Sequence, residues 1–535
     1  MKRCPQCRRD YTDETLNFCL DDGAALLDGP ASADEMSTAI LSEPSVAVTS
    51  RSSDEAVTGV LPLAHAKSEV LNADTFAIPN SIAVLPFTHM SSDEDNEYFC
   101  DGLAEELINA LSKIDQLKVA ARTSTFSFKG KDTDISEIAK KLSVRTVLEG
   151  SVRKSGDKMR ITVQLINAAD GYHLWSERYD REMKDIFDIQ DEITLAVVDT
   201  LKIKLFGAER SAVVKRHTEN TEAYRAYLKG RYLRHAKNDH YGALKAFKEA
   251  IRLDPAHAPS WVGVAEASIL SAHYALVPAR EACDSARNAL TKAKKLDGES
   301  AHTIYVEAFI AYVTRDWVAL DQAFSRSDSF HPPHPNAKGS YGLIQCVLSR
   351  FDEALRLFAE AREADPLAAF PYAVTAAGLT AAGKASEAGI FLEQAFTFEK
   401  DNMLALWASC STNIALGNFE QAIAAAERVV EISRQAPFFV GLLGWAYAMN
   451  GQLDKGRTIL EELRQRAATE PALVSEAWLL GALGEKDAAF DLLFRALDEF
   501  QAYVLYLGLP GFDTLREDPR FEELTRRINL PELPK

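Results

Sequence analysis

Small and apolar residues in the C-terminal half of the chain recur every 34 residues. One column of small residues holds Ala354, Ala388, Ala422 and Gly456. A second column lies twelve residues upstream and holds Ala308, Gly342, Ala376, Cys410 and Gly444. Four residues after the first column come Phe358, Leu392, Ala426 and Leu460. A fixed period of this length predicts a repeat array, and small residues at these offsets are typical of helix–turn–helix repeats.

The same register extends in both directions, with two irregularities. Working back from Ala354 gives Leu320 and Ala286, but the next anchor, Ala243, lies 43 residues before Ala286. Nine extra residues are therefore expected in the second repeat, around residues 273–280. The last alanine of this column, Ala489, lies 33 residues after Gly456, one fewer than the period. We predict an all-α solenoid of about eight repeats over residues 220–500, followed by a C-terminal cap over 501–535.

This pattern resembles tetratricopeptide repeats, and Trp261 with Ala265 fits the signature of their first helix. In that family the first helices line a concave groove that binds a partner. Carrying the groove offsets onto this register selects six aromatic residues, a residue type that often anchors protein interfaces. They are Tyr305, Phe309, Tyr312, Trp407, Phe438 and Trp445. The resemblance implies binding of an apolar or helical segment of a protein partner, and the alternative is packing between repeats.

Residues 80–207 alternate between strand and helix patterns. Ile82–Phe87 is a short apolar run typical of a buried strand, with Pro86 at its end. Apolar residues at helical spacing predict helices over 99–114, 135–142 and 189–205, and Lys118–Arg122 predicts a second strand. Three further strands are expected over 146–152, 159–165 and 172–179. The order β-α-β-α-β-β-β-α predicts a compact α/β domain.

Five stretches of this region resemble the TolB-like amino-terminal domain. They are Ala83–Phe87, Tyr98–Leu107, Ala121–Ser124, Leu148–Arg153 and Leu174–Asp180. In bacteria this domain commonly precedes tetratricopeptide repeats, and in related chains it follows a DNA-binding, nucleotide cyclase or kinase domain. The resemblance implies an interaction domain associated with signalling and no particular reaction.

The chain carries few signs of catalysis. Kinase, nucleophile-elbow and H-E-x-x-H motifs are missing from the sequence, and the segment from Gly150 to Lys158 lacks phosphate-loop spacing. Arg122, Thr123 and Ser124 follow a predicted strand and are candidates for binding a small anionic ligand. His331–Pro335 contains two histidines between prolines, which predicts a rigid turn rather than a metal site. We therefore predict a protein that is not an enzyme.

The net charge of −18 argues against nucleic-acid binding, which depends on cations that neutralise phosphates. Four of the seven cysteines, from Cys100 to Cys410, lie singly in helical patterns, so a reducing compartment is expected. The sequence contains no run of 18 apolar residues and no apolar stretch after its basic start. These features predict a cytoplasmic protein without a membrane span.

The first 27 residues hold a cysteine pattern that suggests zinc. Cys4 and Cys7 form a C-x-x-C turn, Cys19 follows, and Asp22 occupies the place of a fourth cysteine. Three thiolates and a carboxylate suit tetrahedral Zn²⁺. The stretch resembles the short zinc ribbons of many bacterial multidomain proteins, although a metal-free knuckle, a redox pair and Asp21 as ligand remain alternatives. Residues 28–79, rich in Ser, Ala, Thr and acids, predict a flexible linker.

The combined prediction is a bacterial scaffold or regulatory protein that binds protein partners through its repeats. The alternative is a signalling component whose α/β domain senses a small anionic ligand through Arg122, Thr123 and Ser124.

Overall fold

The computed structural model divides the chain into two compact units, Met1–Val70 and Leu71–Lys535. In the first unit it describes three short strands. In the second it describes residues 80–90, 97–155, 158–182, 185–205, 210, 215–237, 239–274, 276–327, 329–330, 332–466 and 471–530.

The first unit contains a small antiparallel sheet in the order β2-β1-β3. Its strands are β1 (Lys2–Arg3), β2 (Asp10–Tyr11) and β3 (Leu27–Asp28). The predicted zinc ligands lie outside the described residues, as does the predicted linker after Asp28. These ligands are Cys4, Cys7, Cys19 and Asp22.

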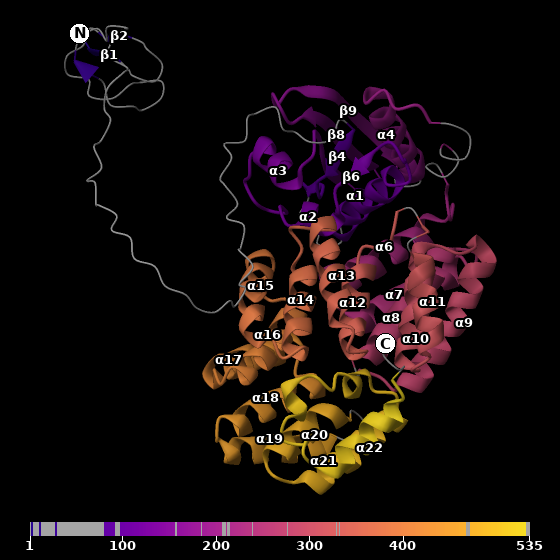
Figure 1. Ribbon diagram of the computed structural model, residues 1–535. Helices are drawn as coiled ribbons and strands as arrows, with labels where there is room; N and C mark the ends of the chain where they lie inside the picture. The colour runs from indigo at the N-terminus through magenta and orange to yellow at the C-terminus, as the bar shows by residue number, and fades with distance from the viewer. Residues whose placement is uncertain are drawn as a thin grey trace, which may run out of the picture. The chain divides into compact units, whose positions relative to one another are not determined.

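The α/β domain is built on a mixed sheet (Figure 1), whose strand order is β6-β4-β7-β8-β9 with β5 paired to β7. Strand β4 is parallel to both β6 and β7, whereas β7, β8 and β9 form an antiparallel meander. The strands are β4 (Ser81–Val84), β5 (Thr88–His89), β6 (Lys118–Val119), β7 (Thr146–Ser155), β8 (Lys158–Asn167) and β9 (His173–Glu182).

Helices connect and cover this sheet. They are α1 (Glu97–Leu111), α2 (Arg122–Phe126), α3 (Ile135–Leu142) and α4 (Ile186–Thr200). The predicted α/β class is confirmed, but the second strand ends at Val119, and Arg122 begins a short helix instead. Hydroxyl groups in this helix and at its C-cap donate to nearby backbone carbonyls: Thr125 donates to Arg122 and Ser127 donates to Ser124. Such local bonds favour a turn over continuation of a strand.

The two faces of the sheet belong to different cores. Alternate residues of β7 and β8, such as Leu148 and Val163, pack with α1 and α4 in one cluster. Val147 faces the other way and packs with Ile138 and Ala139 of α3. The sheet is therefore covered on both sides near β4 and β7.

The repeat array contains eight helix pairs among the described residues (Figure 1). The first helices of the pairs are α6 (Thr221–Ala236), α8 (Ala258–His273), α10 (Ala301–Val313), α12 (Ala337–Val347), α14 (Ala369–Ala381), α16 (Met403–Ala415), α18 (Pro437–Met449) and α20 (Leu473–Ala482). The second helices are α7 (His240–Leu253), α9 (Ala279–Asp297), α11 (Trp317–Ser327), α13 (Phe351–Ala364), α15 (Ala385–Phe398), α17 (Phe419–Ile432), α19 (Leu453–Arg466) and α21 (Lys486–Asp498).

The columns of small residues lie where helices approach most closely. Phe358, which is fully buried, fills the space between neighbouring first helices. A Cβ added at Gly342 would lie 2.7 Å from its ring, and one at Gly378 would crowd the other side of the ring. The 34-residue period therefore reflects the alternation of large residues with the small residues that accommodate them.

Most of the nine extra residues of the second repeat lengthen its two helices. Helix α8 has 16 residues and α9 has 19, whereas α14 and α15 have 13 and 14. The expected site around 273–280 marks the junction of these two long helices.

After α21 the chain forms two short 3₁₀ helices, η3 (Ala502–Leu505) and η4 (Pro510–Phe512), and ends its described part in α22 (Pro519–Ile528). None of the helices in the described part of the chain is both long and apolar enough to cross a bilayer.

Candidate functional site

The six aromatic residues predicted to line the groove are all buried. The most exposed of them, Phe309, shows only 6% of its surface. The others are Tyr305, Tyr312, Trp407, Phe438 and Trp445. Their side chains point into one continuous core of the array.

Much of this core is completed by the chain's own segment 499–512, which packs against first helices from distant repeats. Tyr503 of η3 stacks on Phe438, with ring centroids 4.0 Å apart and planes at 17°. Its ring also lies 5.7 Å from that of Trp407, and Tyr506 lies 6.5 Å from Tyr312. Three of the predicted groove residues, Tyr312, Trp407 and Phe438, thus contact a polypeptide segment, and that segment belongs to this chain.

Backbone and terminal contacts hold the C-terminal residues, including this segment, in place. A Cβ at Gly508 would collide with the carbonyl oxygen of Ala381, so the backbone can approach α14 only at a glycine. Beyond η4, the indole Nε1 of Trp317 donates to the carbonyl oxygen of Asn529 at 2.9 Å. The C-terminal residues therefore do more than cover the last helix pair, since they connect early and late repeats.

A polar group lies among the first helices of the early repeats. Side-chain N and O atoms of Glu266, His302 and His334 lie within 4.8 Å of one another, which is close enough for all three to bind one metal ion. Glu266 already forms an ion pair with Arg234, and its carboxylate accepts a hydrogen bond from Nε2 of His302 at 2.9 Å. The His334 ring stacks on Tyr305 at 3.7 Å. Because a guanidinium neutralises the only carboxylate, this arrangement is that of a structural ion pair.

The three residues predicted to hold a small anion contact carboxylates of this chain. Arg122 pairs with Glu105 of α1. The hydroxyls of Thr123 and Ser124 donate to the two oxygens of Asp365, which follows α13, and the amide of Leu367 donates to Ser124 at 3.1 Å. Burial raises the pKa of Asp365, and the two hydroxyl donors oppose that rise. The anion at this place is a side chain of the repeat array.

A second set of ion pairs joins α1 to the first repeat. Arg231 of α6 lies 2.7 Å from Glu105 and 2.6 Å from Glu106, and its side chain is 15% exposed. The Arg231–Glu105 contact is an ion pair without hydrogen-bond geometry, since Oε2 of Glu105 has no hydrogen-bond partner. Within the α/β domain itself, Lys129 pairs with Asp101 of α1 at 2.7 Å, and burial raises the pKa of Asp101 against the effect of that lysine. Charged residues of α1 therefore act as contacts between the domain and the array.

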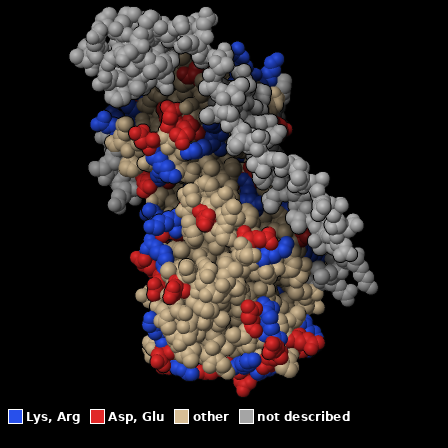
Figure 2. All heavy atoms as spheres, turned by 60° about the vertical axis from the view of Figure 1, so that its left-hand side comes forward, with Lys and Arg blue, Asp and Glu red and all other residues tan. Residues whose placement is uncertain are grey.

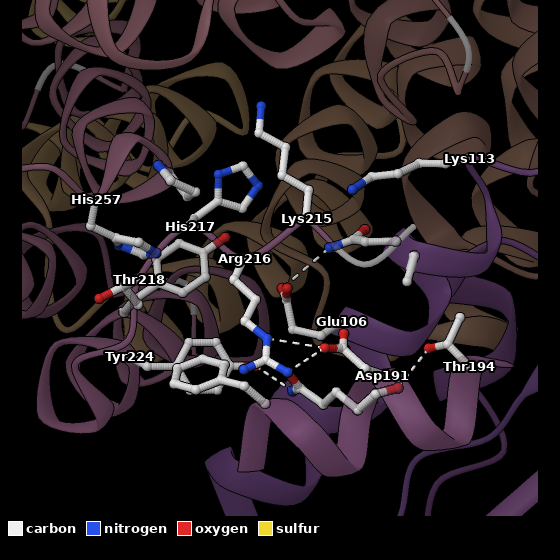
Figure 3. Close-up of a pocket in the computed structure, with 16 residues that line it drawn as sticks. Glu106, Lys113, Asp191, Thr194, Lys215, Arg216, His217, Thr218, Tyr224 and His257 are labelled. Carbon is white, nitrogen blue, oxygen red and sulfur yellow. Dashed lines mark hydrogen bonds and ion pairs between the residues drawn. The ribbon is translucent and has the colours of Figure 1, made fainter. Parts of the chain in front are cut away.

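A pocket of about 230 Å³ lies beside these ion pairs (Figure 3). Its walls come from α1, α4, the segment before α6, α6 itself and the start of α8. The residues are Glu106, Asn109, Ala110, Lys113, Phe187, Gln190, Asp191, Thr194, Lys215, Arg216, His217, Thr218, Tyr224, Tyr227, His257 and Pro259.

Most charged groups around the pocket are paired with one another. Arg216 lies 2.5 Å from Asp191, and Glu106 is paired with Arg231. Lys215 and His217 both contact Asp297, the latter at 3.4 Å. Burial lowers the pKa of His217, so this imidazole stays neutral at neutral pH. This balance of charge gives no reason to expect a strongly charged ligand.

Sequence reasoning missed Asp365, Arg231 and Tyr503, which the structure places at these contacts. Asp365 lies directly after the last residue of α13, where an acidic residue is common and suggests no particular contact. Tyr503 lies outside the 34-residue register. The aromatic composition of segment 499–512 is the one signal in the sequence that distinguished it from a polar terminus.

Comparisons with known proteins match two parts of the chain. Residues 79–196 match a family described as the HilA/YgeH-like transcriptional regulator, second domain. Residues 413–477 match a tetratricopeptide repeat family. The tetratricopeptide prediction is thereby confirmed for the later repeats, while the resemblances to a TolB-like domain and a zinc ribbon stay predictions.

Two further comparisons match a curated protein over a short stretch and a solved structure over most of the chain. A putative adenylate cyclase 3 from Rhizobium meliloti (strain 1021) is 46% identical over 151 residues, which cover 28% of this chain. The match spans 26% of that relative's own length. The crystal structure of yeast Tom70 covers 82% of this chain and 86% of its own chain, with 13% identity and a TM-score of 0.33.

Proposed function

We propose that this chain is a regulatory protein without catalytic activity, which binds other proteins through its repeat array. The tetratricopeptide match supports the binding role, and the match to a domain of transcriptional regulators supports a regulatory one. We place its work in the cytoplasm, because Cys100, Cys283, Cys346 and Cys410 are free and buried.

The observation that carries this proposal is the distribution of charge over the repeats. Helices α14, α16 and α18 contain no charged residue, as expected for helices that are buried over most of their length, so only the exposed residues around them bear on partner binding. Figure 2 shows a broad part of one face of the array where charged side chains are sparse. Low charge is a property of the centres of protein interfaces rather than of ordinary surface.

One half-exposed apolar cluster lies at the ends of these helices. Tyr372, Phe396, Phe398 and Leu404 pack on a base of alanines from α14, α15 and α16 and remain only partly buried. The rings of Tyr372 and Phe398 are 5.3 Å apart. Since the six predicted groove aromatics are all buried, this half-exposed cluster is the part of the array we assign to partner binding.

Replacing Phe398 and Leu404 with glutamate is expected to weaken partner binding about tenfold or more, because charge would enter an apolar contact. The measurement is affinity capture of the full chain from extracts of its own organism, with the recovered proteins quantified by mass spectrometry. Ile390→Glu is the matched control, since Ile390 lies on the same helix α15 and is 61% exposed. Equal recovery by both variants, with folding intact by circular dichroism, would refute the assignment.

We also propose that Cys4, Cys7, Cys19 and Asp22 hold zinc, because three thiolates and a carboxylate form a complete tetrahedral donor set. Purified protein is expected to contain close to one zinc per chain by metal analysis, and Cys4→Ser is expected to lose it. Cys283→Ser is the control, because Cys283 is buried in α9 and should leave the zinc content unchanged. Protein purified without any zinc would contradict the proposal.

A further inference from the structure

Strand β9 is the terminal strand of the α/β sheet and pairs with β8 alone among the described strands. Apart from Trp175 and Tyr179, its residues are exposed. The backbone of such an edge offers N–H and C=O groups to a strand from another molecule. Ten residues make β9 long for an unprotected edge.

Charges alternate along the centre of this strand. Glu177, Arg178, Asp180 and Arg181 surround Tyr179, so the signs run minus, plus, minus, plus about it. Tyr179 opposes Ile161 and belongs to the core beneath α1 and α4, which places residues 177 and 181 on the same face. Arg178 and Asp180 therefore share the opposite face, where Arg160 of β8 pairs with Asp180 at 2.6 Å.

We propose that β9 pairs antiparallel with β9 of a second copy of this chain, about a two-fold axis through Tyr179. In that register Arg178 lies opposite Asp180 of the other copy, and Glu177 lies opposite Arg181. The two-fold axis repeats each pair, because both copies use the same surface. Directly opposed side chains share a face of an antiparallel sheet, so all four pairs join opposite charges.

The charge pattern also selects this register over its neighbours. An axis through residue 178 would place the Arg178 side chains of the two copies opposite each other, and an axis through residue 180 would do the same with the Asp180 side chains. Like charges directly opposite each other are unfavourable. Placing the axis between residues would join the helix-covered face of one sheet to the uncovered face of the other. The strand is thus complementary to itself in one arrangement.

A second copy fits this edge better than an arbitrary strand. Charged edges normally discourage pairing, unless the partner presents the opposite charges in the same order. The overlap extends from Ser176 to Glu182, which is short for a permanent interface. The dimer is therefore expected to dissociate on dilution.

Sedimentation equilibrium of the full chain, up to about 100 µM, is the primary test. The wild-type chain is expected to form dimers within that range. Arg178→Asp and Asp180→Arg are each expected to weaken dimerisation about tenfold or more, because each places like charges opposite one another. The double variant with both substitutions restores opposite charges and is expected to dimerise again.

Mixing the two single variants gives a sharper result. The variant Arg178→Asp has aspartate at positions 178 and 180, whereas the variant Asp180→Arg has arginine at both positions. A mixture of the two is therefore expected to form heterodimers, while neither variant dimerises alone. A swap of the exposed pair Arg495 and Glu499 is the control and should leave the dimer unchanged. A wild-type chain that stays monomeric, or single variants that dimerise as strongly as wild type, would overturn the proposal.

Discussion

Replacing Tyr503 with alanine is expected to lower the free energy of unfolding of the repeat array by about 3–5 kcal/mol, the range for removing a large aromatic side chain from a packed core. Tyr503 is 4% exposed, and its ring stacks on Phe438 and contacts Trp407. The substitution would leave a cavity between first helices from different repeats. Urea unfolding followed by tryptophan fluorescence measures the loss, since Trp407, Trp445 and Trp478 all lie in this core.

The matched control is Tyr241→Ala, because Tyr241 lies on α7 and is 81% exposed. Its removal should change the free energy of unfolding little. A double-mutant cycle with Phe438→Ala should add a coupling of about 0.5–1.5 kcal/mol for the stacked rings. If Tyr503→Ala lowered the free energy of unfolding no more than Tyr241→Ala does, segment 499–512 would be loosely attached to the array and would not be part of its core.

The repeat array could be predicted from the sequence because each repeat contacts mainly its neighbours. Residues such as Ala354 and Gly342 recur at fixed offsets, so their role follows from local spacing. The position of Tyr503 obeys no such rule, because its contacts with Phe438 and His273 join segments that no local pattern relates. The sequence predicted a cap on the last helix pair, and the structure extends that cap across the array.

The candidate ligand residues show a similar limit. Arg122, Thr123 and Ser124 were predicted to bind a small anionic ligand, and in the structure they contact carboxylates of the chain itself. The sequence could not show that a carboxylate 241 residues further along the chain, that of Asp365, fills this place. Long-range pairing of this kind depends on how the α/β domain meets the array, and each partner taken alone looks like an ordinary surface residue.

The second large effect concerns the buried charges between α1 and α6. Arg231→Met is expected to lower the free energy of unfolding by about 3–5 kcal/mol, because Glu105 is 3% exposed and would lose one of its two cationic partners. Urea unfolding followed by circular dichroism measures the change. Arg356→Met is the matched control: Arg356 also contacts two glutamates, but its side chain is 56% exposed, so little change is expected.

The double variant Glu105→Gln/Arg231→Met separates two explanations of this effect. A buried ion pair contributes little net stability, and most of the damage from removing one partner comes from the charge left behind. The double variant should therefore be more stable than Arg231→Met alone, even though it lacks both charges. A double variant less stable than the single one would mean that the attraction between these side chains itself holds the α/β domain against the first repeat. In that case the junction would weaken with rising salt, because screening reduces attraction between partly exposed charges such as Arg231 and Glu106.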